Sequence, residues 1–398
     1  MNEYIPSQQF GARGQYTLPA QAYLSPSVFD AEQDRIFSQQ WICVFRESEI
    51  PNAGDFRTIT VASESLIILR DHNGKIRSHV NLCRHRGTRL CLAEQGTFAK
   101  TIQCPYHGWT YGLDGKLNGV PDETCFPQFD RSQYPLHSVA CTLWQGFIWI
   151  NLAQSDCQSN TQPSAALDFS AYIKPIQDKV IPWQIGELVE IQKIDYQVKA
   201  NWKLIVQNYS ECYHCAPVHP MLTKISPPKS GGNDLTQGPI FGGYMDVITP
   251  GGSMTISGRS CGPTVGPLDP ADLQRVYYYV LFPNLFLALH HDYVMVHSLW
   301  PQSPGLTTVE CRWLFHPAVK SKSANELGNR ELEYDPSDGI KFWDQTNRED
   351  WHVSQLTQQG VSSRRYRPGP YSDREAMSAA FDRHYLACMN DMACLKDF

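Results

Sequence analysis

Residues 208 to 220 read Asn208-Tyr-Ser-Glu-Cys-Tyr-His-Cys-Ala-Pro-Val-His-Pro220 and place Glu211, His214 and His219 close together in the chain. Such a cluster is typical of a metal site, because imidazole nitrogens and carboxylate oxygens are common ligands of transition metals. A carboxylate from elsewhere would complete the two-histidine, one-carboxylate facial triad that holds ferrous iron and leaves positions open for oxygen. The alternative is that these are surface or core histidines near a helix end.

The segment before the histidines predicts how they are positioned. Apolar residues recur at helical spacing from residue 198 to 213, which predicts a helix carrying Glu211 and His214 one turn apart on one face. Pro217 is expected to end this helix, because the residue before a proline avoids the α region and proline donates no backbone hydrogen bond. His219 then lies beyond the helix, where the chain can fold back towards His214.

Composition narrows the class of function. The formal net charge is −6 and no long basic run occurs, which argues against nucleic acid or an anionic membrane and favours a small-molecule substrate. No basic leader precedes an apolar stretch and no run of about eighteen apolar residues occurs, so a cytoplasmic protein is expected. The 13 cysteines are expected to be reduced or metal-bound. Cys212 and Cys215 are interpreted as packing residues around His214 rather than as a redox pair.

The length of 398 residues favours two domains. A helix is expected from Ser27 to Trp41, followed up to about residue 152 by short β runs with a hairpin at Asn73-Gly74. Residues 153 to 167 are polar and rich in turn formers, which predicts a linker between the first, all-β module and the second domain.

Beyond the linker the pattern changes to mixed α and β. Consecutive antiparallel strands are expected between residues 276 and 316, and a helix from about 338 to 359 closes the chain. Residues 226 to 270 are rich in Gly, Pro and Ser and predict a long loop or lid. The expected second domain is therefore α+β, an antiparallel sheet with long helices on one face.

A second constellation lies in the all-β module. Cys83-x-His85 and Cys104-x-x-His107 each pair one thiolate with one imidazole. A Cys2His2 set is commonly a zinc site, but zinc fingers usually pair Cys with Cys and His with His. Two loops that each supply one Cys and one His are what a Rieske [2Fe-2S] centre needs, with both cysteines on one iron and both histidines on the other.

The segments Cys83-Arg-His85 and Cys104-Pro-Tyr-His-Gly-Trp-Thr-Tyr111, followed by residues 208 to 220, resemble the oxygenase (alpha) subunits of Rieske non-haem iron oxygenases. The resemblance covers nearly the whole chain. It implies an α+β protein with a Rieske domain at residues 41 to 155 and a helix-grip catalytic domain at 156 to 398. Residues 1 to 40 would form a helical segment packing on the catalytic domain. The implied cofactors are a [2Fe-2S] cluster and Fe(II).

The same resemblance implies that the third iron ligand is an aspartate on the C-terminal helix. Asp344 and Asp350 both qualify chemically. Asp350 is preferred, because Glu349-Asp350 followed by Gln358 and Gly360 is similar to the pattern of the choline monooxygenase branch. Asp344 is the alternative.

Family members also carry an acidic residue before the first ligand histidine, which bridges the Rieske histidine of one subunit to the iron histidine of its neighbour. Here that position is Glu211. Most family members have Asp at this position, whereas a Glu here resembles the carnitine and choline monooxygenases. Transfer between subunits implies a homotrimer.

The implied reaction is hydroxylation of a small molecule with O2. No Gly-rich dinucleotide fingerprint or P-loop occurs, so NAD(P)H is expected to act through a separate flavin or iron–sulfur reductase. The branch similarity implies a quaternary ammonium substrate like choline, carnitine or betaine, with N-demethylation or C–N cleavage. A cation–π cage could draw on some of these aromatic residues: Tyr209, Tyr213, Phe286, Tyr293, Trp300 and Trp343.

Two other functions stay open. One is dioxygenation of an aromatic ring, or O- or N-demethylation of an aromatic substrate. The other is not enzymatic, an iron–sulfur electron-transfer protein or a zinc-binding protein.

Overall fold

The computed structural model describes residues 15–153, 168–249, 252–319 and 334–389. The chain divides into two compact units, Gln33–Phe169 and the combination of Met1–Glu32 with Ser170–Phe398. The linker expected at 153 to 167 lies almost wholly outside the described residues. Within the described part, no helix has the length and apolar character needed to cross a membrane.

The unit Gln33–Phe169 is built from short strands in three antiparallel sheets, in agreement with the all-β expectation. The sheet orders are β1-β10-β9, β4-β3-β2-β5 and β6-β7-β8. The strands are β1 (Ile42–Arg46), β2 (Asp55–Val61), β3 (Glu64–Arg70), β4 (Ile76–Val80), β5 (Gln95–Thr97), β6 (Thr101–Gln103), β7 (Thr110–Gly112), β8 (Leu117–Gly119), β9 (Ala140–Trp144) and β10 (Phe147–Asn151).

The predicted hairpin joins β3 to β4. Asp71 closes the turn by accepting backbone N–H bonds from Asn73 (2.9 Å) and Lys75 (3.0 Å). Gly74 has a φ of 78°, a left-handed conformation that glycine adopts without steric cost. The core between the sheets includes Cys83 and Cys104, so the two loops that follow these cysteines start from buried positions.

The other unit contains a seven-stranded antiparallel sheet of order β11-β17-β16-β15-β14-β13-β12. Every residue of β15 is buried, because this strand lies in the middle of the sheet with both faces covered. Its strands are β11 (Val189–Val198), β12 (Gly232–Leu235), β13 (Ile240–Asp246), β14 (Arg275–Leu281), β15 (Leu285–Leu289), β16 (Tyr293–Ser303) and β17 (Leu306–Phe315).

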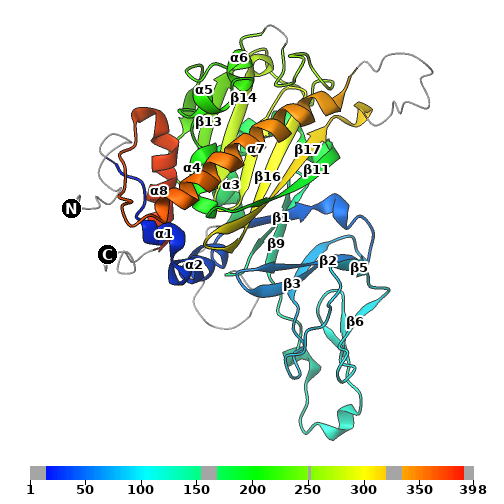
Figure 1. Ribbon diagram of the computed structural model, residues 1–398. Coiled ribbons are helices and arrows are strands. Elements are labelled where there is room, and N and C mark those ends of the chain that lie inside the picture. The colour runs from blue at the N-terminus through cyan, green and yellow to red at the C-terminus, as the bar shows by residue number, and fades with distance from the viewer. Residues whose placement is uncertain (1–14, 154–167, 250–251, 320–333, 390–398) are drawn as a thin grey trace. The chain divides into compact units, whose positions relative to one another are not determined.

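Helices accompany this sheet, and Figure 1 shows the long helix α7 lying across it. Helix α4 packs against both α7 and α8, and all three helices also contact the sheet. The α-helices are α1 (Ala20–Leu24), α2 (Pro26–Glu32), α3 (Phe169–Val180), α4 (Trp202–Tyr209), α5 (Cys215–Val218), α6 (Leu222–Ile225), α7 (Pro336–Val361) and α8 (Ala376–Met389).

A buried polar cluster fixes helix α4, which leads into the candidate site. Lys203 on α4 donates to Glu32 at the end of α2 at 2.5 Å, and both side chains are fully buried. Trp202 and Tyr385 also donate to this carboxylate, each at 2.8 Å. A buried charge pair is tolerated when such hydrogen bonds satisfy it, so α2, α4 and α8 are tied together at one point.

Four sequence predictions about elements were wrong. The helix expected over 27 to 41 ends as an α-helix at Glu32 and continues as a π-helical turn to Phe37. The helix expected over 198 to 213 is limited to α4, and the expected loop 226 to 270 contains β12 and β13. The chain does not close with α7, because α8 follows it.

Candidate active site

The turn after α4 positions His214. Asn201 caps α4 at its start by accepting the backbone N–H of Lys203, and the hydroxyl of Ser210 ends it by donating to the carbonyl of Val206 at 2.6 Å. Glu211 and His214 therefore lie on a turn rather than on one helix face. Pro217 was expected to end the helix that carries His214, and this was also wrong. It lies in the first turn of α5, where a backbone N–H has no partner within the helix, so a proline is tolerated.

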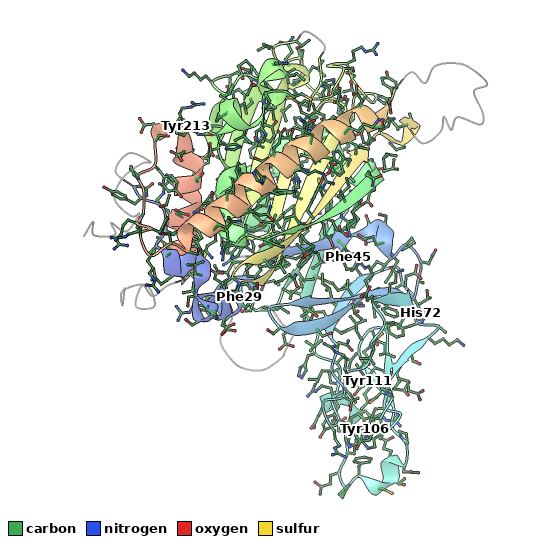
Figure 2. The ribbon with its side chains drawn as sticks, viewed as in Figure 1. Phe29, Phe45, His72, Tyr106, Tyr111 and Tyr213 are labelled. Carbon is green, nitrogen blue, oxygen red and sulfur yellow. A yellow bond between two sulfur atoms is a disulfide. The ribbon has the colours of Figure 1, made fainter. Side chains whose placement is uncertain are left out.

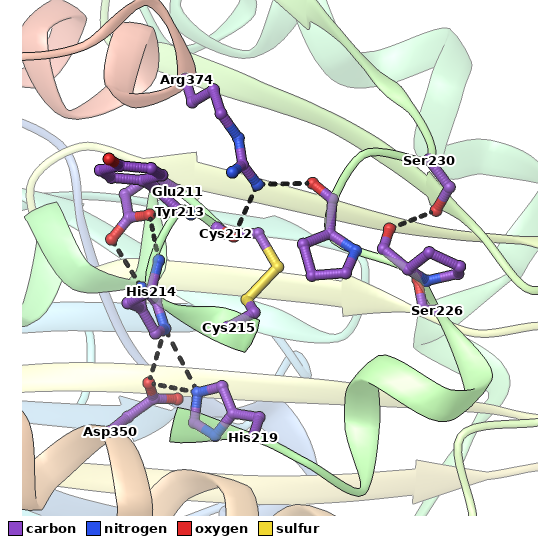
Figure 3. The surroundings of a disulfide bond; sticks show 12 residues. Glu211, Cys212, Tyr213, His214, Cys215, His219, Ser226, Ser230, Asp350 and Arg374 are labelled. Carbon is purple, nitrogen blue, oxygen red and sulfur yellow. Dashed lines mark hydrogen bonds and ion pairs between the residues drawn. A yellow bond between two sulfur atoms is a disulfide. The ribbon is translucent and has the colours of Figure 1, made fainter. Parts of the chain in front are cut away.

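A disulfide joins Cys212 to Cys215 across this turn, with a Cα–Cα distance of 4.9 Å (Figure 3). The expectation that these two were reduced packing residues was wrong. The bond closes a ring that contains Tyr213 and His214. It therefore restricts the backbone that carries His214 without occupying either nitrogen of its ring.

His214, His219 and Asp350 converge at one point (Figure 3). The Nε2 atoms of the two histidines are 3.2 Å apart. Oδ1 of Asp350 lies 3.2 Å from Nε2 of His214 and 2.9 Å from Nε2 of His219. The two histidines come from opposite ends of α5, and the aspartate comes from the middle of α7.

Each imidazole also meets a carboxylate at its other nitrogen. Oε1 of Glu211 lies 2.6 Å from Nδ1 of His214, and Oε2 of Glu349 lies 2.7 Å from Nδ1 of His219. A carboxylate at Nδ1 keeps the proton on that nitrogen and leaves the lone pair of Nε2 for a metal. The contact of Glu349 with His219 was not predicted from the sequence. The only sequence signal for it is that Glu349 is adjacent to Asp350.

The alternative aspartate lies elsewhere on α7. Asp344 accepts a hydrogen bond from the hydroxyl of Tyr196 at 2.7 Å and another from Nε of Arg348 at 3.0 Å. Each of its oxygens thus accepts one of these two hydrogen bonds. Among the described residues, Asp344 contacts neither His214 nor His219.

The electrostatics of this cluster favour a cation at its centre. Burial alone lowers the pKa of His214, but hydrogen bonds to Asp350 and Glu211 outweigh it and raise the pKa to about 10. Burial alone raises the pKa of Asp350, but hydrogen bonds from His214 and His219 lower it to about 2. Three carboxylates around two imidazoles thus give a negative site with hard oxygen and borderline nitrogen donors, which fits ferrous iron.

The four residues of the second constellation lie on two similar loops. Gly87 donates its N–H to the carbonyl of Cys83 at 3.0 Å, and Gly108 donates to the carbonyl of Cys104 at 3.1 Å. Both glycines adopt positive φ, 77° and 70°, so each loop turns tightly past its cysteine. Figure 2 labels Tyr106, in the second loop, and Tyr111, directly after it.

The side chains at the loop tips fit a Rieske cluster. Cys83 and Cys104 are buried and carry free thiols. The rings of His85 and His107 lie 4.6 Å apart between centroids, and Trp109 stacks on His85 at 4.8 Å.

Two further observations support that fit. Nδ1 of His85 is buried and has no hydrogen-bond partner among the described residues. The hydroxyl of Tyr111 lies 3.3 Å from Sγ of Cys83, the position from which a donor stabilises a metal-bound thiolate.

A cavity of about 480 Å³ opens beside the triad. His214, His219 and Asp350 all contribute to its wall. Of the six aromatic residues considered for a cage, Tyr209 and Trp343 line it, while Tyr213 is exposed at the surface. Three aromatic residues that sequence reasoning did not name also line it: Phe241, Tyr244 and Tyr278.

Comparison with protein families gives two matches. Residues 185–391 match the ring hydroxylating alpha subunit (catalytic domain), and residues 40–130 match the Rieske [2Fe-2S] domain. The chain belongs to the Rieske non-haem iron oxygenases. The match confirms the expected fold class, and the enzyme carries a [2Fe-2S] cluster and a non-haem iron as its cofactors.

Individual relatives support this membership. The glycine betaine monooxygenase oxygenase subunit of Chromohalobacter salexigens is 31% identical over 397 residues, covering 90% of this chain and 82% of the relative. The carnitine monooxygenase oxygenase subunit of Escherichia coli (strain K12) is 32% identical over 222 residues, covering 55% of this chain and 56% of the relative. This Rieske oxygenase is thus similar to alpha subunits that are named as monooxygenase components.

Solved structures share its fold. The quaternary ammonium Rieske monooxygenase CntA in complex with L-carnitine has a TM-score of 0.71 and 25% identity, covering 98% of this chain and 100% of that chain. Naphthalene 1,2-dioxygenase from Rhodococcus sp. has a TM-score of 0.67 and 23% identity, covering 93% of this chain and 94% of that chain, and shows the fold alone.

Proposed function

We propose that His214, His219 and Asp350 bind the mononuclear Fe(II), and that Cys83, His85, Cys104 and His107 bind the [2Fe-2S] cluster. The convergence of Nε2 of both histidines with Oδ1 of Asp350, all within 3.2 Å, supports the first assignment. The paired loops and the unpartnered Nδ1 of His85 support the second. When bound, the iron supplies O2 activation and the cluster supplies an electron.

The substrate is a quaternary ammonium compound. The observation that carries this choice is the aromatic wall of the cavity, which includes Tyr209, Tyr278 and Trp343. Aromatic faces attract a cation that cannot donate hydrogen bonds. The named activities of the betaine and carnitine monooxygenase relatives, and the CntA complex with L-carnitine, point to the same class.

The reaction inserts one oxygen atom of O2 into a C–H bond on a carbon attached to the nitrogen. The other oxygen atom leaves as water with two protons and two electrons from a reductase. If the carbon is a methyl group, the hydroxymethyl product loses formaldehyde and a proton, and the electrons of the broken C–N bond stay on nitrogen. The net result is N-demethylation, or C–N cleavage when another carbon is attacked.

Residues around the cavity orient both the iron ligands and the substrate. Glu211 and Glu349 hold the protons on Nδ1 of His214 and His219, so that both Nε2 atoms face Asp350. Tyr209 is itself held in place, because its hydroxyl donates to the carbonyl of Leu287 at 2.9 Å and its ring stacks on Phe286 at 4.2 Å. The aromatic wall can therefore keep the ammonium group in one orientation.

Glu211 is also the proposed route for electrons between subunits. Its Oε1 contacts Nδ1 of His214, and a carboxylate can accept a further hydrogen bond from the Rieske histidine of a neighbouring chain. Such an arrangement requires a homotrimer in which each iron site receives its electron from the next subunit. NAD(P)H acts indirectly, through a separate flavin or iron–sulfur reductase.

The test is an assay of the purified chain with a reductase, NADH and O2. Glycine betaine or another trimethylammonium compound should stimulate oxygen uptake and yield one carbonyl product for each O2 consumed, which is formaldehyde when a methyl group is attacked. Metal analysis should give about three irons per chain, two for the cluster and one mononuclear. Stimulation by aromatic acids alone would overturn the substrate class, and zinc in place of iron would overturn the assignment of both sites.

A further inference from the structure

The cavity beside the triad carries opposite charges in different parts of its wall. Glu211 and Asp350 contribute carboxylates, whereas Lys229 and Arg374 contribute cations. Figure 3 shows Arg374 on the other side of the Cys212–Cys215 disulfide from Asp350. A ligand that spans the cavity from the triad to Arg374 therefore reaches a positively charged region at the end away from the triad.

The guanidinium of Arg374 is held in place by contacts that, within the described part of the chain, include no carboxylate. Its Nη2 donates to the carbonyls of Cys212 (3.3 Å) and Pro228 (3.1 Å), and its Cζ lies 5.0 Å from the ring centroid of Tyr213. These contacts leave Nε and Nη1 without a hydrogen-bond partner among the described residues. The planar guanidinium is thus fixed in orientation, and Nε and Nη1 can each still donate a charge-assisted hydrogen bond to a carboxylate oxygen.

Lys229 is a second cation in the wall of this cavity. It lies between Pro228 and Ser230 on the segment that leads into β12, and no carboxylate of the described residues lies within salt-bridge distance of it. Surface lysines often lack a partner, so Lys229 alone would carry no argument. It lines the same cavity as Arg374, and the carbonyl of its neighbour Pro228 accepts a hydrogen bond from that guanidinium.

The opposite part of the cavity offers aromatic faces and unused polar atoms. Tyr278 lies 6.1 Å from Tyr209 and 6.2 Å from Trp343, measured between ring centroids. The hydroxyl of Tyr278 and Oδ1 of Asn208 are buried without a hydrogen-bond partner among the described residues. Buried polar atoms are normally satisfied, so these two point to a ligand or water that occupies this part of the cavity.

We propose that Lys229 and Arg374 bind the carboxylate of the substrate, so that the enzyme selects zwitterionic quaternary ammonium compounds over analogues that lack a carboxylate. This inference rests on the proposed function, because it takes the ammonium group to lie at the aromatic wall formed by Tyr209, Tyr278 and Trp343. The carboxylate then extends away from the triad, towards the two cations. An N-methyl group or the carbon next to nitrogen is thereby the part of the substrate closest to the histidines.

The test compares glycine betaine with choline, which has the same trimethylammonium group and a hydroxyl in place of the carboxylate. The holoenzyme is assayed with reductase and NADH by formaldehyde release. Arg374→Gln and Lys229→Gln should each raise the KM for glycine betaine and lower its kcat/KM by about 10- to 100-fold, the usual effect of losing a hydrogen bond to a charged group. The kcat/KM for choline should stay unchanged.

Arg364→Gln is the matched control, because Arg364 is exposed on the same unit and does not line the cavity. Equal losses for both substrates in the Arg374 and Lys229 variants would indicate a structural role and overturn the inference. Equal use of choline and glycine betaine by the unaltered enzyme would overturn it while the proposed function stands. Failure to oxidise any trimethylammonium compound tested, L-carnitine included, would overturn the proposed function itself.

Discussion

Oε2 of Glu349 lies 2.7 Å from Nδ1 of His219, and the next residue in α7 places its own carboxylate 2.9 Å from Nε2 of the same ring. One imidazole is thus held at both nitrogens by consecutive residues of one helix. If Asp350 is an iron ligand, Glu349 orients the histidine that binds beside it. Any rotation of α7 about its axis would therefore change the contacts of Glu349 and Asp350 with His219 together.

Glu349→Ala should weaken binding of the mononuclear iron by about 10- to 100-fold, because His219 loses the acceptor that orients its ring and holds its tautomer. Glu349→Gln retains a carbonyl acceptor and should lose less. The measurement is the mononuclear iron retained after dialysis against a graded series of chelator concentrations. The visible spectrum of the cluster should not change in either variant, and native iron affinity in Glu349→Ala would contradict the role of this carboxylate.

Asp350→Asn should remove the mononuclear iron and abolish turnover, because an amide oxygen carries no charge to offset a divalent cation. Asp344→Asn is the matched control on the same helix. It should keep both metals, since Asp344 bonds to Tyr196 and Arg348 rather than to a histidine. Loss of iron in the Asp344 variant, with iron retained in the Asp350 variant, would reverse the choice of ligand.

Glu211→Gln should keep both metals and slow the delivery of electrons, because an amide accepts fewer hydrogen bonds than the carboxylate it replaces. We expect a decrease of about 10- to 100-fold in the rate at which the reduced cluster is oxidised in a single turnover with substrate and O2. Stopped-flow absorbance of the cluster measures this rate. An unchanged rate would show that electrons do not pass through Glu211.

Sequence reasoning succeeded where a local pattern decides the structure. Strands β14 to β17 are rich in β-branched and aromatic residues, which suit a buried sheet. The histidine segment was recognisable because its chemistry is concentrated in a few neighbouring residues. Glu349 carried no comparable signal, since its contact with His219 depends on how a helix 130 positions later in the chain is rotated.

Strand β13, helix α8 and one disulfide were not predicted, because their residues resemble other local patterns. Gly242 and Gly243 made β13 resemble a loop, but a Cβ at Gly242 would lie 2.0 Å from the carbonyl oxygen of Tyr278 in the paired strand. Close strand contact, rather than a turn, requires that glycine. Helix α8 is buried on most sides, so its apolar residues show little helical periodicity. The pairing of Cys212 with Cys215 depends on the turn that ends α4. A longer helix was predicted there, so the turn and its disulfide were missed.

The buried carboxyl of Asp382 on α8 should make the stability of its unit depend on pH. Burial raises its pKa from 3.8 to about 7, although hydrogen bonds from Gln207 and Tyr371 oppose this shift. As pH rises from about 4 to 7, the unfolded chain releases this proton while the folded protein keeps it. The contribution to stability is therefore complete below about pH 4 and is lost as pH rises through about 7.

Asp382→Asn removes this titration while keeping a side chain of similar shape. The difference in free energy of unfolding, wild type minus variant, should fall as pH rises from 4.5 to 7.5, by at most about 4 kcal/mol, since one pKa unit corresponds to about 1.4 kcal/mol. Urea denaturation at several pH values measures it. A constant difference across this range would show that the carboxyl of Asp382 does not titrate there.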